Sequence, residues 1–382
     1  MLALSTQRSR LRTPLTLVLV LAGILLVLHL WHLPTHDAEV IHVITRPAPG
    51  APTQHHVPLP TKTPPAQAPA HLPELPSLPP DPEEDKQINL KTDVDECQAL
   101  QGAEELFVVL KTGATELHHK LPIHFNTTLK CIPHYAIFSD MAEEVNGHTI
   151  HDALDTVSDE VSREAEEFTL YHKMREYHNM GKNISDVMRS PDDTKTAWNL
   201  DKWKFLPMMV KAYELRDDAK WYVFVEADTY ILYSNLLMYL EHLRPEQDWY
   251  IGGQTWIDDD VFAHGGTGFV ISNPAMKKLT AMLKAEKEEM EKMTLREWAG
   301  DLVLSKALKK VGISLTQTWP IFQGETPSTL DFTERHYCYP VVSYHHVNAE
   351  WVQFLWDFEQ EWIKTNVSQH FNKAPISGIY LT

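Results

Sequence analysis

The sequence has few cysteines and too few basic residues for several common functions. Its 382 residues include three cysteines, Cys97, Cys131 and Cys338, with no C-x-x-C pair and no spacing typical of a zinc site. An odd count permits at most one disulfide and leaves one thiol over. The 34 lysines and arginines are outnumbered by 52 acidic residues, so the formal net charge is −18. Because nucleic-acid affinity rests largely on basic residues that neutralise phosphates, this balance excludes a general nucleic-acid binder.

The chain has enough apolar residues for a large folded core. Hydrophobic residues make up 43% of the sequence and aromatic residues 10%, which supports one large domain or two ordinary ones. With so acidic a chain, any anionic ligand requires local cationic side chains or a metal ion.

The first 33 residues are typical of a membrane anchor. Residues 1–14 contain Arg8, Arg10 and Arg12 and no acid, and the nineteen residues 15–33 form an apolar run. At about 1.5 Å per residue this run would span roughly 28 Å, close to the ~30 Å hydrocarbon core of a bilayer. The flanking charges predict a cytosolic tail, a signal-anchor and a lumenal remainder. A cleaved signal peptide is the alternative, although the run is longer than usual for one.

Residues 34–94 are predicted to form an extended stem, because 14 of the 25 prolines fall between Pro34 and Pro82. The globular part then covers residues 95–382 on the lumenal side. It contains three N-x-S/T sequons, which a secretory location would make usable. The sequons begin at Asn126, Asn183 and Asn366.

Strand and helix patterns alternate within residues 95–382. A long helix is predicted over Asp152–Asn179, and a second in "SNLLMYLEHL", capped by Ser234 or Asn235. This alternation predicts an α/β domain with a single, mostly parallel central sheet flanked by helices, whose ligands bind at the carboxyl ends of the strands. The predicted buried strands lie in "ELFVVLKTGAT", "YAIFSD" and "WYVFVEAD".

Two carboxylates, Glu226 and Asp228, end the last of these predicted strands. Ionised carboxylates beside apolar segments require a cation or hydrogen bonds to offset desolvation. An E-x-D sequence at a strand end can supply oxygen ligands to Mn²⁺ or Mg²⁺, which in turn binds a diphosphate. The alternative interpretation is an ordinary solvated strand end.

Seven short motifs in one order resemble glycosyltransferase family 31, in particular its fungal branch, related to the core 1 β-1,3-galactosyltransferases and to fringe. The resemblance covers Cys97 to Glu361 and implies a GT-A type nucleotide-sugar transferase fold. It also implies an inverting, metal-dependent transfer of a hexose, of the galactose or N-acetylhexosamine type, from a UDP-sugar to a glycan or glycoprotein hydroxyl, with a β-1,3 linkage. The implied location is the Golgi membrane, as a single-pass type II protein. The motifs are "KTGATE", "IFSD", "LDKWKFL", "WYVFVEADTY", "FAHGGTGFVIS", "GD" at Gly300 and Asp301, and "HYCYPVVSYHHV".

The resemblance assigns metal ligands and a base to numbered residues. The acidic motif and a late histidine bind Mn²⁺ (or Mg²⁺) in such enzymes, which implies Asp228, Glu226 and His345 as ligands, with His346 adjacent. Imidazole and carboxylate together suit Mn²⁺. Asp301 matches the catalytic base, which an inverting transferase needs to take the acceptor proton. A packed or solvated histidine and a helix N-cap are the alternative roles of His345 and Asp301.

The same resemblance implies a donor-binding set. Two alternative roles remain for members of this set. The two glycines of "HGGTG" could form an ordinary tight turn, and Lys202 could be a surface lysine. The set consists of Thr112, Gly113, Asp140, Lys202, Gly265 and Gly266.

The chain also departs from the family pattern. Fungal relatives commonly carry two cysteines before "GD", where this chain has Trp298 and Ala299, so Cys97 and Cys131 remain as the implied pair and a lumenal location permits their bond. Glu226 stands where Asp is more usual.

The sequence leaves two other functions open. One is a glycosidase, which also needs two carboxylates. The other is a catalytically silent membrane-tethered lectin-like or chaperone-like relative. The sequence also leaves a homodimer open.

Overall fold

The computed structural model describes Cys97, Leu100 and residues 102–182, 184, 188 and 191–370. The predicted tail, anchor and stem all lie outside the described residues, as does the sequon asparagine Asn183. Within the described part of the chain, no helix combines the length and the apolar character needed to cross a membrane. The described residues all belong to one unit, Gln87–Thr382.

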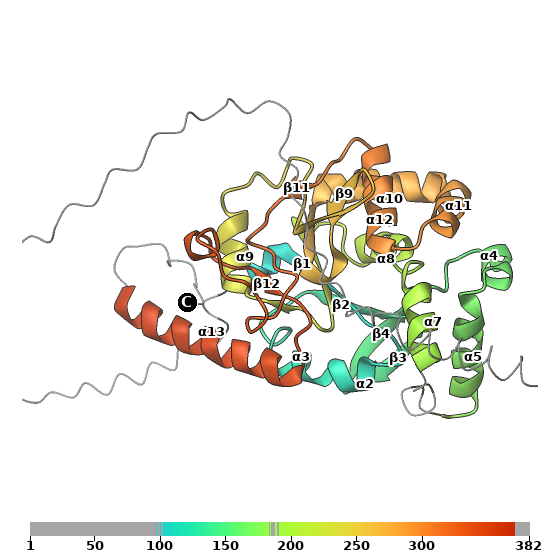
Figure 1. Ribbon diagram of the computed structural model, residues 1–382, viewed down its shortest axis with the longest axis horizontal. Coiled ribbons are helices and arrows are strands. Elements are labelled where there is room, and N and C mark those ends of the chain that lie inside the picture. The colour runs from blue at the N-terminus through green and yellow to red at the C-terminus, as the bar shows by residue number, and fades with distance from the viewer. Residues whose placement is uncertain are drawn as a thin grey trace, which may run out of the picture. The chain divides into compact units, whose positions relative to one another are not determined.

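An eight-stranded sheet forms the centre of this unit (Figure 1). The central strand β1 is parallel to β2 and β5, and β2 is parallel to β4, whereas β10 runs antiparallel to β5 and β7. The predicted α/β class with a mostly parallel sheet is confirmed, and it is consistent with a GT-A type fold. In spatial order the strands are β11 (Thr316–Gln317), β7 (Tyr250–Gly252), β10 (Phe269–Ser272), β5 (Trp221–Glu226), β1 (Leu106–Lys111), β2 (Tyr135–Ser139), β4 (His148–Asp152) and β3 (Glu143–Val145).

Helices cover both faces of the sheet because its central strands are apolar on both sides. In β1, Val108 and Leu110 belong to one hydrophobic cluster, and Phe107 and Val109 to another on the opposite face. The second cluster includes residues of α8, α10, α11 and α12, which lie together in Figure 1. Those helices are α8 (Phe205–Leu215), α10 (Asn273–Ala285), α11 (Lys287–Arg296) and α12 (Gly300–Lys310). The first cluster includes residues of α2 (Leu117–Lys120), α9 (Tyr233–Leu240) and α13 (Ala349–His370), and α3 (Pro122–Asn126) packs beside it.

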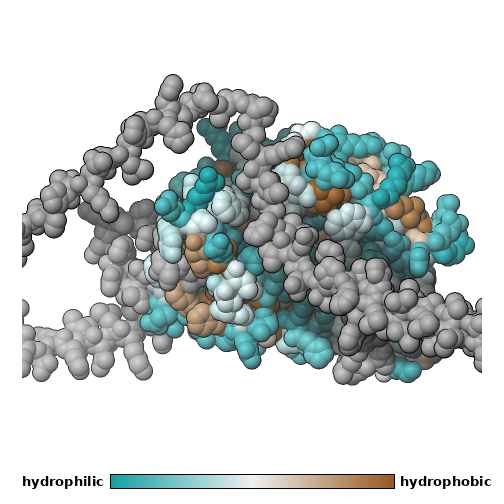
Figure 2. All heavy atoms as spheres, in the orientation of Figure 1, coloured by the Kyte–Doolittle hydropathy of each residue, from teal (hydrophilic) through white to brown (hydrophobic). Residues whose placement is uncertain are grey.

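A third hydrophobic cluster is formed with a separate group of helices, α4 (Asp159–Glu164), α5 (Phe168–Asn179) and α7 (Pro191–Asp201). Its members include Phe168, Met174 and Trp203. Hydrophilic residues predominate on the coloured part of the surface in Figure 2, and the hydrophobic ones there form small separate areas. The three clusters contain most of the buried apolar residues of the described part of the chain, including those of the predicted strands.

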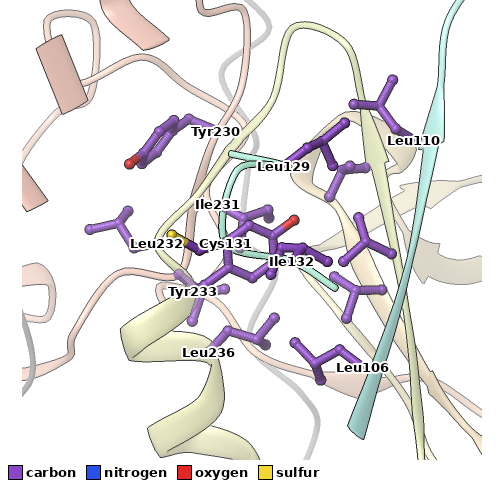
Figure 3. Packing of buried hydrophobic residues seen from close by; sticks show 14 of the residues in the cluster. Leu106, Leu110, Leu129, Cys131, Ile132, Tyr230, Ile231, Leu232, Tyr233 and Leu236 are labelled. Atoms are coloured by element: carbon purple, nitrogen blue, oxygen red, sulfur yellow. The ribbon is translucent and has the colours of Figure 1, made fainter. Parts of the chain in front are cut away.

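The segment that follows Asp228 is anchored by apolar packing. Tyr230, Ile231, Leu232 and Tyr233 are almost fully buried and pack in the same cluster as Leu106 and Leu110 of β1 (Figure 3). Burying one such side chain contributes roughly 1.5–3 kcal/mol to stability. This packing fixes the turn between β5 and β6 (Tyr230–Ile231), which carries Asp228 and directly follows Glu226, the last residue of β5.

Two local predictions were wrong. The single helix predicted over Asp152–Asn179 is instead the end of β4 followed by α4 and α5, because Ala165 is extended and ends α4. The N-terminus of α4 is capped by Ser158, whose hydroxyl accepts a hydrogen bond from the Val161 amide. Helix α9 begins at Tyr233 without a side-chain cap, so neither Ser234 nor Asn235 caps it.

The implied disulfide is present between Cys97 and Cys131, with an S–S distance of 2.08 Å. It joins the segment before β1 to the loop after α3. The sequon residue Asn126 is exposed at the end of α3, and Asn366 falls within α13. Glycosylation of the three sequons stays a prediction.

Candidate active site

A cavity of about 650 Å³ lies at the carboxyl ends of β1, β2 and β5. This is the edge of the sheet at which the sequence pattern predicted a ligand. Nine of the ten predicted site residues line it, and the tenth, Gly265, donates a hydrogen bond to one of them. The nine are Thr112, Gly113, Asp140, Lys202, Glu226, Asp228, Gly266, Asp301 and His345.

Strand pairing brings the candidate metal ligands together from distant parts of the chain. β12 (Ser343–Tyr344) runs antiparallel to β6, with Tyr344 opposite Tyr230. Just beyond this pair, the Val347 amide donates a hydrogen bond of 3.0 Å to the Asp228 carbonyl. As a result, His345 Nε2 lies 3.5 Å from Asp228 Oδ1.

Asp228, His345 and His346 form a group whose ligand atoms all lie within 4.8 Å of one another. His345 is buried, and its Nδ1 atom has no hydrogen-bond partner. Burial opposes ionisation of Asp228, but the hydrogen bond from His345 and the charge of Lys120 lower its pKa well below the usual range. A carboxylate that stays ionised and two imidazoles fit a divalent transition metal such as Mn²⁺.

Glu226 stands apart from this group. Its Oε2 is 3.8 Å from His345 Nε2, but its other oxygen lies 3.1 Å from the Lys111 ammonium. Lys111 also pairs with Asp201. Burial would lower the pKa of Lys111, but the charges of Asp201 and Glu226 outweigh burial and raise it. Glu226 therefore lies within reach of the metal group while one of its oxygens contacts a cation of the protein.

Lysines supply the positive charge that the two strand-end carboxylates require. Lys120 Nζ lies 3.1 Å from Asp228 Oδ2 and 2.8 Å from Glu116, and Lys111 pairs with Glu226. Lys204 is buried between Asp201, at 3.2 Å, and Asp140, at 3.7 Å. The carboxylates predicted a cation here, but no pattern in the sequence singled out these three lysines, although Lys111 opens the "KTGATE" motif.

Asp301 is held by backbone groups from two elements. Its Oδ2 accepts a hydrogen bond of 2.9 Å from the Gly265 amide, and its Oδ1 accepts one from the Leu302 amide. It occupies the second position of α12, so it is not the N-cap. Burial raises its pKa above the ordinary value. A raised pKa makes this carboxylate a stronger base.

The predicted donor-side residues end two neighbouring strands. Thr112 follows β1 and Asp140 follows β2; the Oγ1 atom of Thr112 and the Oδ2 atom of Asp140 are buried and lack hydrogen-bond partners. The other oxygen of Asp140 accepts from the Ala114 amide at 2.6 Å, which fixes the turn containing Gly113. Asp140 Oδ2 still has the Lys204 ammonium 3.7 Å away, whereas the Thr112 hydroxyl has no hydrogen-bond partner. A buried hydroxyl left without a partner on a cavity wall favours a polar ligand in that cavity.

The two glycines of "HGGTG" lie in a 3₁₀ turn, η2 (Gly265–Thr267), against the site. A Cβ atom on Gly266 would come within 2.1 Å of the His345 ring. On Gly265 it would lie 3.1 Å from Glu226 Oε1 and 3.6 Å from Asp301 Oδ2. Both positions require glycine because site residues approach the backbone closely, and not because of their backbone angles.

Lys202 lines the cavity, but its ammonium is already paired. It lies 2.7 Å from Glu167 and donates a hydrogen bond of 3.0 Å to the Glu297 carbonyl. The donor-binding role that the resemblance implies for Lys202 would compete with both partners. Lys111 and Lys204 line the same cavity closer to the strand ends.

Comparison with known protein families matches residues 101–361 to the family described as Fringe-like. The match spans more than half of the chain and nearly the range covered by the seven motifs. The chain belongs to the Fringe-like family. Membership in the Fringe-like family makes it a glycosyltransferase that acts on glycans, and it does not favour the lectin-like or chaperone-like alternative. Its substrates are a sugar donor and a glycan acceptor.

The Fringe-like site also contains residues that the motifs did not predict. His346 was noted only as a neighbour, yet it joins the metal group although its side chain is exposed. His124 is buried and hydrogen-bonds through Nε2 to the Ala227 carbonyl at 2.8 Å, inside the E-x-D turn. No spacing in the sequence links His124 to Ala227, so only the tertiary structure reveals this support.

Proposed function

We propose that this chain is an inverting, metal-dependent glycosyltransferase of the fungal family 31 type. It moves a hexose, of the galactose or N-acetylhexosamine type, from a UDP-sugar to a hydroxyl of a glycan or glycoprotein, forming a β-1,3 linkage. The observation that best supports this proposal is one cavity that joins a carboxylate and imidazole group, Asp228, His345 and His346, to a separate buried carboxylate, Asp301.

The proposed reaction needs a base on the acceptor side. Asp301 takes the proton of the acceptor hydroxyl as the hydroxyl oxygen attacks C1 of the sugar on the face opposite UDP. The bond between C1 and the phosphate oxygen breaks, and its electron pair leaves with UDP. The backbone hydrogen bonds from Gly265 and Leu302 hold the carboxylate plane during this transfer.

The donor side needs positive charge for a diphosphate. Asp228, His345 and His346 would hold Mn²⁺ or Mg²⁺, which supplies Lewis-acid stabilisation of the leaving group when bound. Lys111 and Lys204 add two buried ammonium groups along the same cavity. Their carboxylate partners keep them ordered in the absence of the donor.

The proposal includes a location. The apolar run at residues 15–33, with its basic flank, supports a single-pass type II protein of the Golgi membrane whose catalytic domain, residues 95–382, is lumenal. The disulfide between Cys97 and Cys131 supports the same oxidising side of the membrane.

The test uses the purified full-length chain. UDP-galactose, UDP-N-acetylglucosamine and UDP-glucose are screened against monosaccharide glycosides with and without Mn²⁺. One donor should support transfer that depends on the metal. Absence of transfer with every donor, or transfer indifferent to chelator, would argue against the proposal.

Asp301→Asn tests the assigned base. It should bind UDP as the unaltered chain does and lower the transfer rate roughly 100-fold or more, because general bases contribute about 10²–10⁴-fold. Asp248→Asn is the matched control, since Asp248 is a surface residue paired with Lys278 outside the cavity. Full activity of Asp301→Asn would rule out Asp301 as the base.

A further inference from the structure

Three tryptophans on the cavity wall are exposed, unlike most large apolar side chains of the described residues. Trp198, Trp256 and Trp298 are 55%, 52% and 54% exposed, and all three line the cavity. Single exposed apolar residues need no explanation, but a group gathered at one cavity marks a binding surface. The three come from separate elements: α7, β8 (Gln254–Ile257) and the segment before α12.

Two of these rings already form a continuous surface. The Trp198 and Trp298 indoles stack with centroids 5.6 Å apart and planes 30° apart. Trp298 precedes the assigned base Asp301 by three residues, and Ala299 and Gly300 between them also line the cavity. The aromatic surface therefore adjoins the carboxylate that would accept the acceptor proton.

The segment that carries Trp298 is fixed by charged residues. Lys202 donates to the Glu297 carbonyl at 3.0 Å, and Lys306 contacts the Glu297 carboxylate at 2.6 Å. A Cβ atom on Gly300 would lie 2.2 Å from the Phe205 ring, so the backbone here packs directly on the start of α8. This gives Lys202 a role: it positions the tryptophan segment rather than the donor.

The donor side of the cavity is chemically different. Beyond the ends of β1 and β2 it carries the buried Thr112 hydroxyl, which has no hydrogen-bond partner, the buried Asp140 carboxylate and buried lysines. A nucleotide diphosphate fits that polar wall. The tryptophans leave an apolar, flat surface next to Asp301 for the second substrate.

We propose that Trp198, Trp256 and Trp298 form an acceptor platform that stacks on the apolar face of a pyranose ring. The C–H bonds on one pyranose face carry partial positive charge, and they match the negative face of an indole ring. The ring hydroxyls remain at the edge, where one can reach Asp301. This inference rests on the proposed function for the identity of the second substrate.

Saturation-transfer NMR on the full-length chain tests the platform without requiring turnover. The probes are the methyl glycosides of galactose, mannose, glucose and N-acetylglucosamine, each with UDP and Mn²⁺ present. We expect at least one glycoside to receive saturation on the C–H protons of one ring face. Trp298→Ala and Trp256→Ala should each weaken its binding about 10-fold or more and leave UDP affinity unchanged. Trp298→Phe, which keeps a ring, should recover part of the loss.

Phe354→Ala is the control, because Phe354 is 57% exposed on α13 and does not line the cavity. It should leave glycoside binding unchanged. The proposal is overturned if no glycoside is saturated by the unaltered chain, or if both tryptophan variants bind it normally. It is also overturned if UDP affinity falls instead, which would place uridine on the rings. Glycoside binding without transfer from any donor would contradict the proposed function and leave the platform standing.

Discussion

Gly266 shows how a residue without a side chain supports a site. The His345 imidazole occupies the space that a Cβ atom on Gly266 would need, with ring atoms 2.1–2.5 Å from that position. Thr229 reinforces this close approach, because its hydroxyl donates to the Gly266 carbonyl at 2.7 Å. The two segments that hold the metal group therefore contact the η2 turn directly.

Gly266→Ala is expected to displace the His345 ring and weaken Mn²⁺-dependent UDP binding by about 10-fold or more, because a buried ring has no free space to move into. Isothermal titration with UDP in the presence of Mn²⁺ measures the effect. The matched control is Gly324→Ala, whose Cβ would make only an ordinary 3.7 Å contact with Thr267. Equal affinities of the two variants would show that His345 tolerates the extra carbon.

At the scale of elements, one buried carboxylate ties the helix α13 to the segment that follows the E-x-D turn. Glu359 of α13 accepts hydrogen bonds of 2.7 Å from the Tyr230 hydroxyl and from the Ser234 hydroxyl. Burial raises the pKa of Glu359 above its ordinary value of 4.5, despite these hydrogen bonds. This explains why Ser234 does not cap α9: its hydroxyl is used by α13.

The raised pKa sets the sign of a pH effect. An acid whose pKa is higher in the folded state contributes stability that is fully present below its unfolded pKa and is lost as pH rises through the folded pKa. Glu359→Gln removes this titration. The variant should therefore gain stability relative to the unaltered chain between about pH 4.5 and neutral pH. Urea denaturation at several pH values measures the difference.

The control for Glu359 is Glu350→Gln, an exposed position at the start of the same helix. Its difference from the unaltered chain should stay flat over the same range. If the difference for Glu359→Gln were also flat, the carboxylate would not be the source of the pH dependence.

Strands were predicted correctly from the sequence where the segment was a short apolar run. β1, β2 and β5 were predicted because each is a short apolar run that ends in polar residues, which is typical of a strand buried on both faces. The helix predicted over Asp152–Asn179 failed because apolar periodicity continued across a break. Ser158 starts a new helix and Ala165 ends it, and such local capping is a weaker signal than periodicity.

At the scale of the whole molecule, the candidate metal group joins two parts of the chain far apart in sequence. Asp228 follows β5, whereas His345 and His346 follow β12. A ligand held by both parts binds only the folded state and stabilises it by mass action, about 2.7 kcal/mol at a concentration 100 times its dissociation constant. Thermal stability is thus a direct readout of the assembled site.

Asp228→Asn is expected to abolish the Mn²⁺-dependent part of the thermal shift produced by UDP. In the unaltered chain, saturating UDP with Mn²⁺ should raise the melting temperature by several degrees more than UDP alone, since about 1 kcal/mol corresponds to roughly 2–4 °C in a domain of this size class. Asp248→Asn should behave as the unaltered chain. A shift that is indifferent to Mn²⁺ and unchanged in Asp228→Asn would remove the metal from the proposed mechanism.

The sequence by itself determined the α/β class, the strands that form the centre of the sheet and the residue types of the site. Apolar runs fix which strands are buried, and short motifs mark where the carboxylates, glycines and histidines lie. Only the tertiary structure decided which of these side chains contact one another. In the folded chain Asp228 lies beside His345 and His346, and Glu226 pairs with Lys111. Lys202 donates a hydrogen bond to the segment that carries Trp298. The physical reason is that distance between side chains depends on strand pairing and packing across the whole domain, and no local pattern in the sequence encodes it.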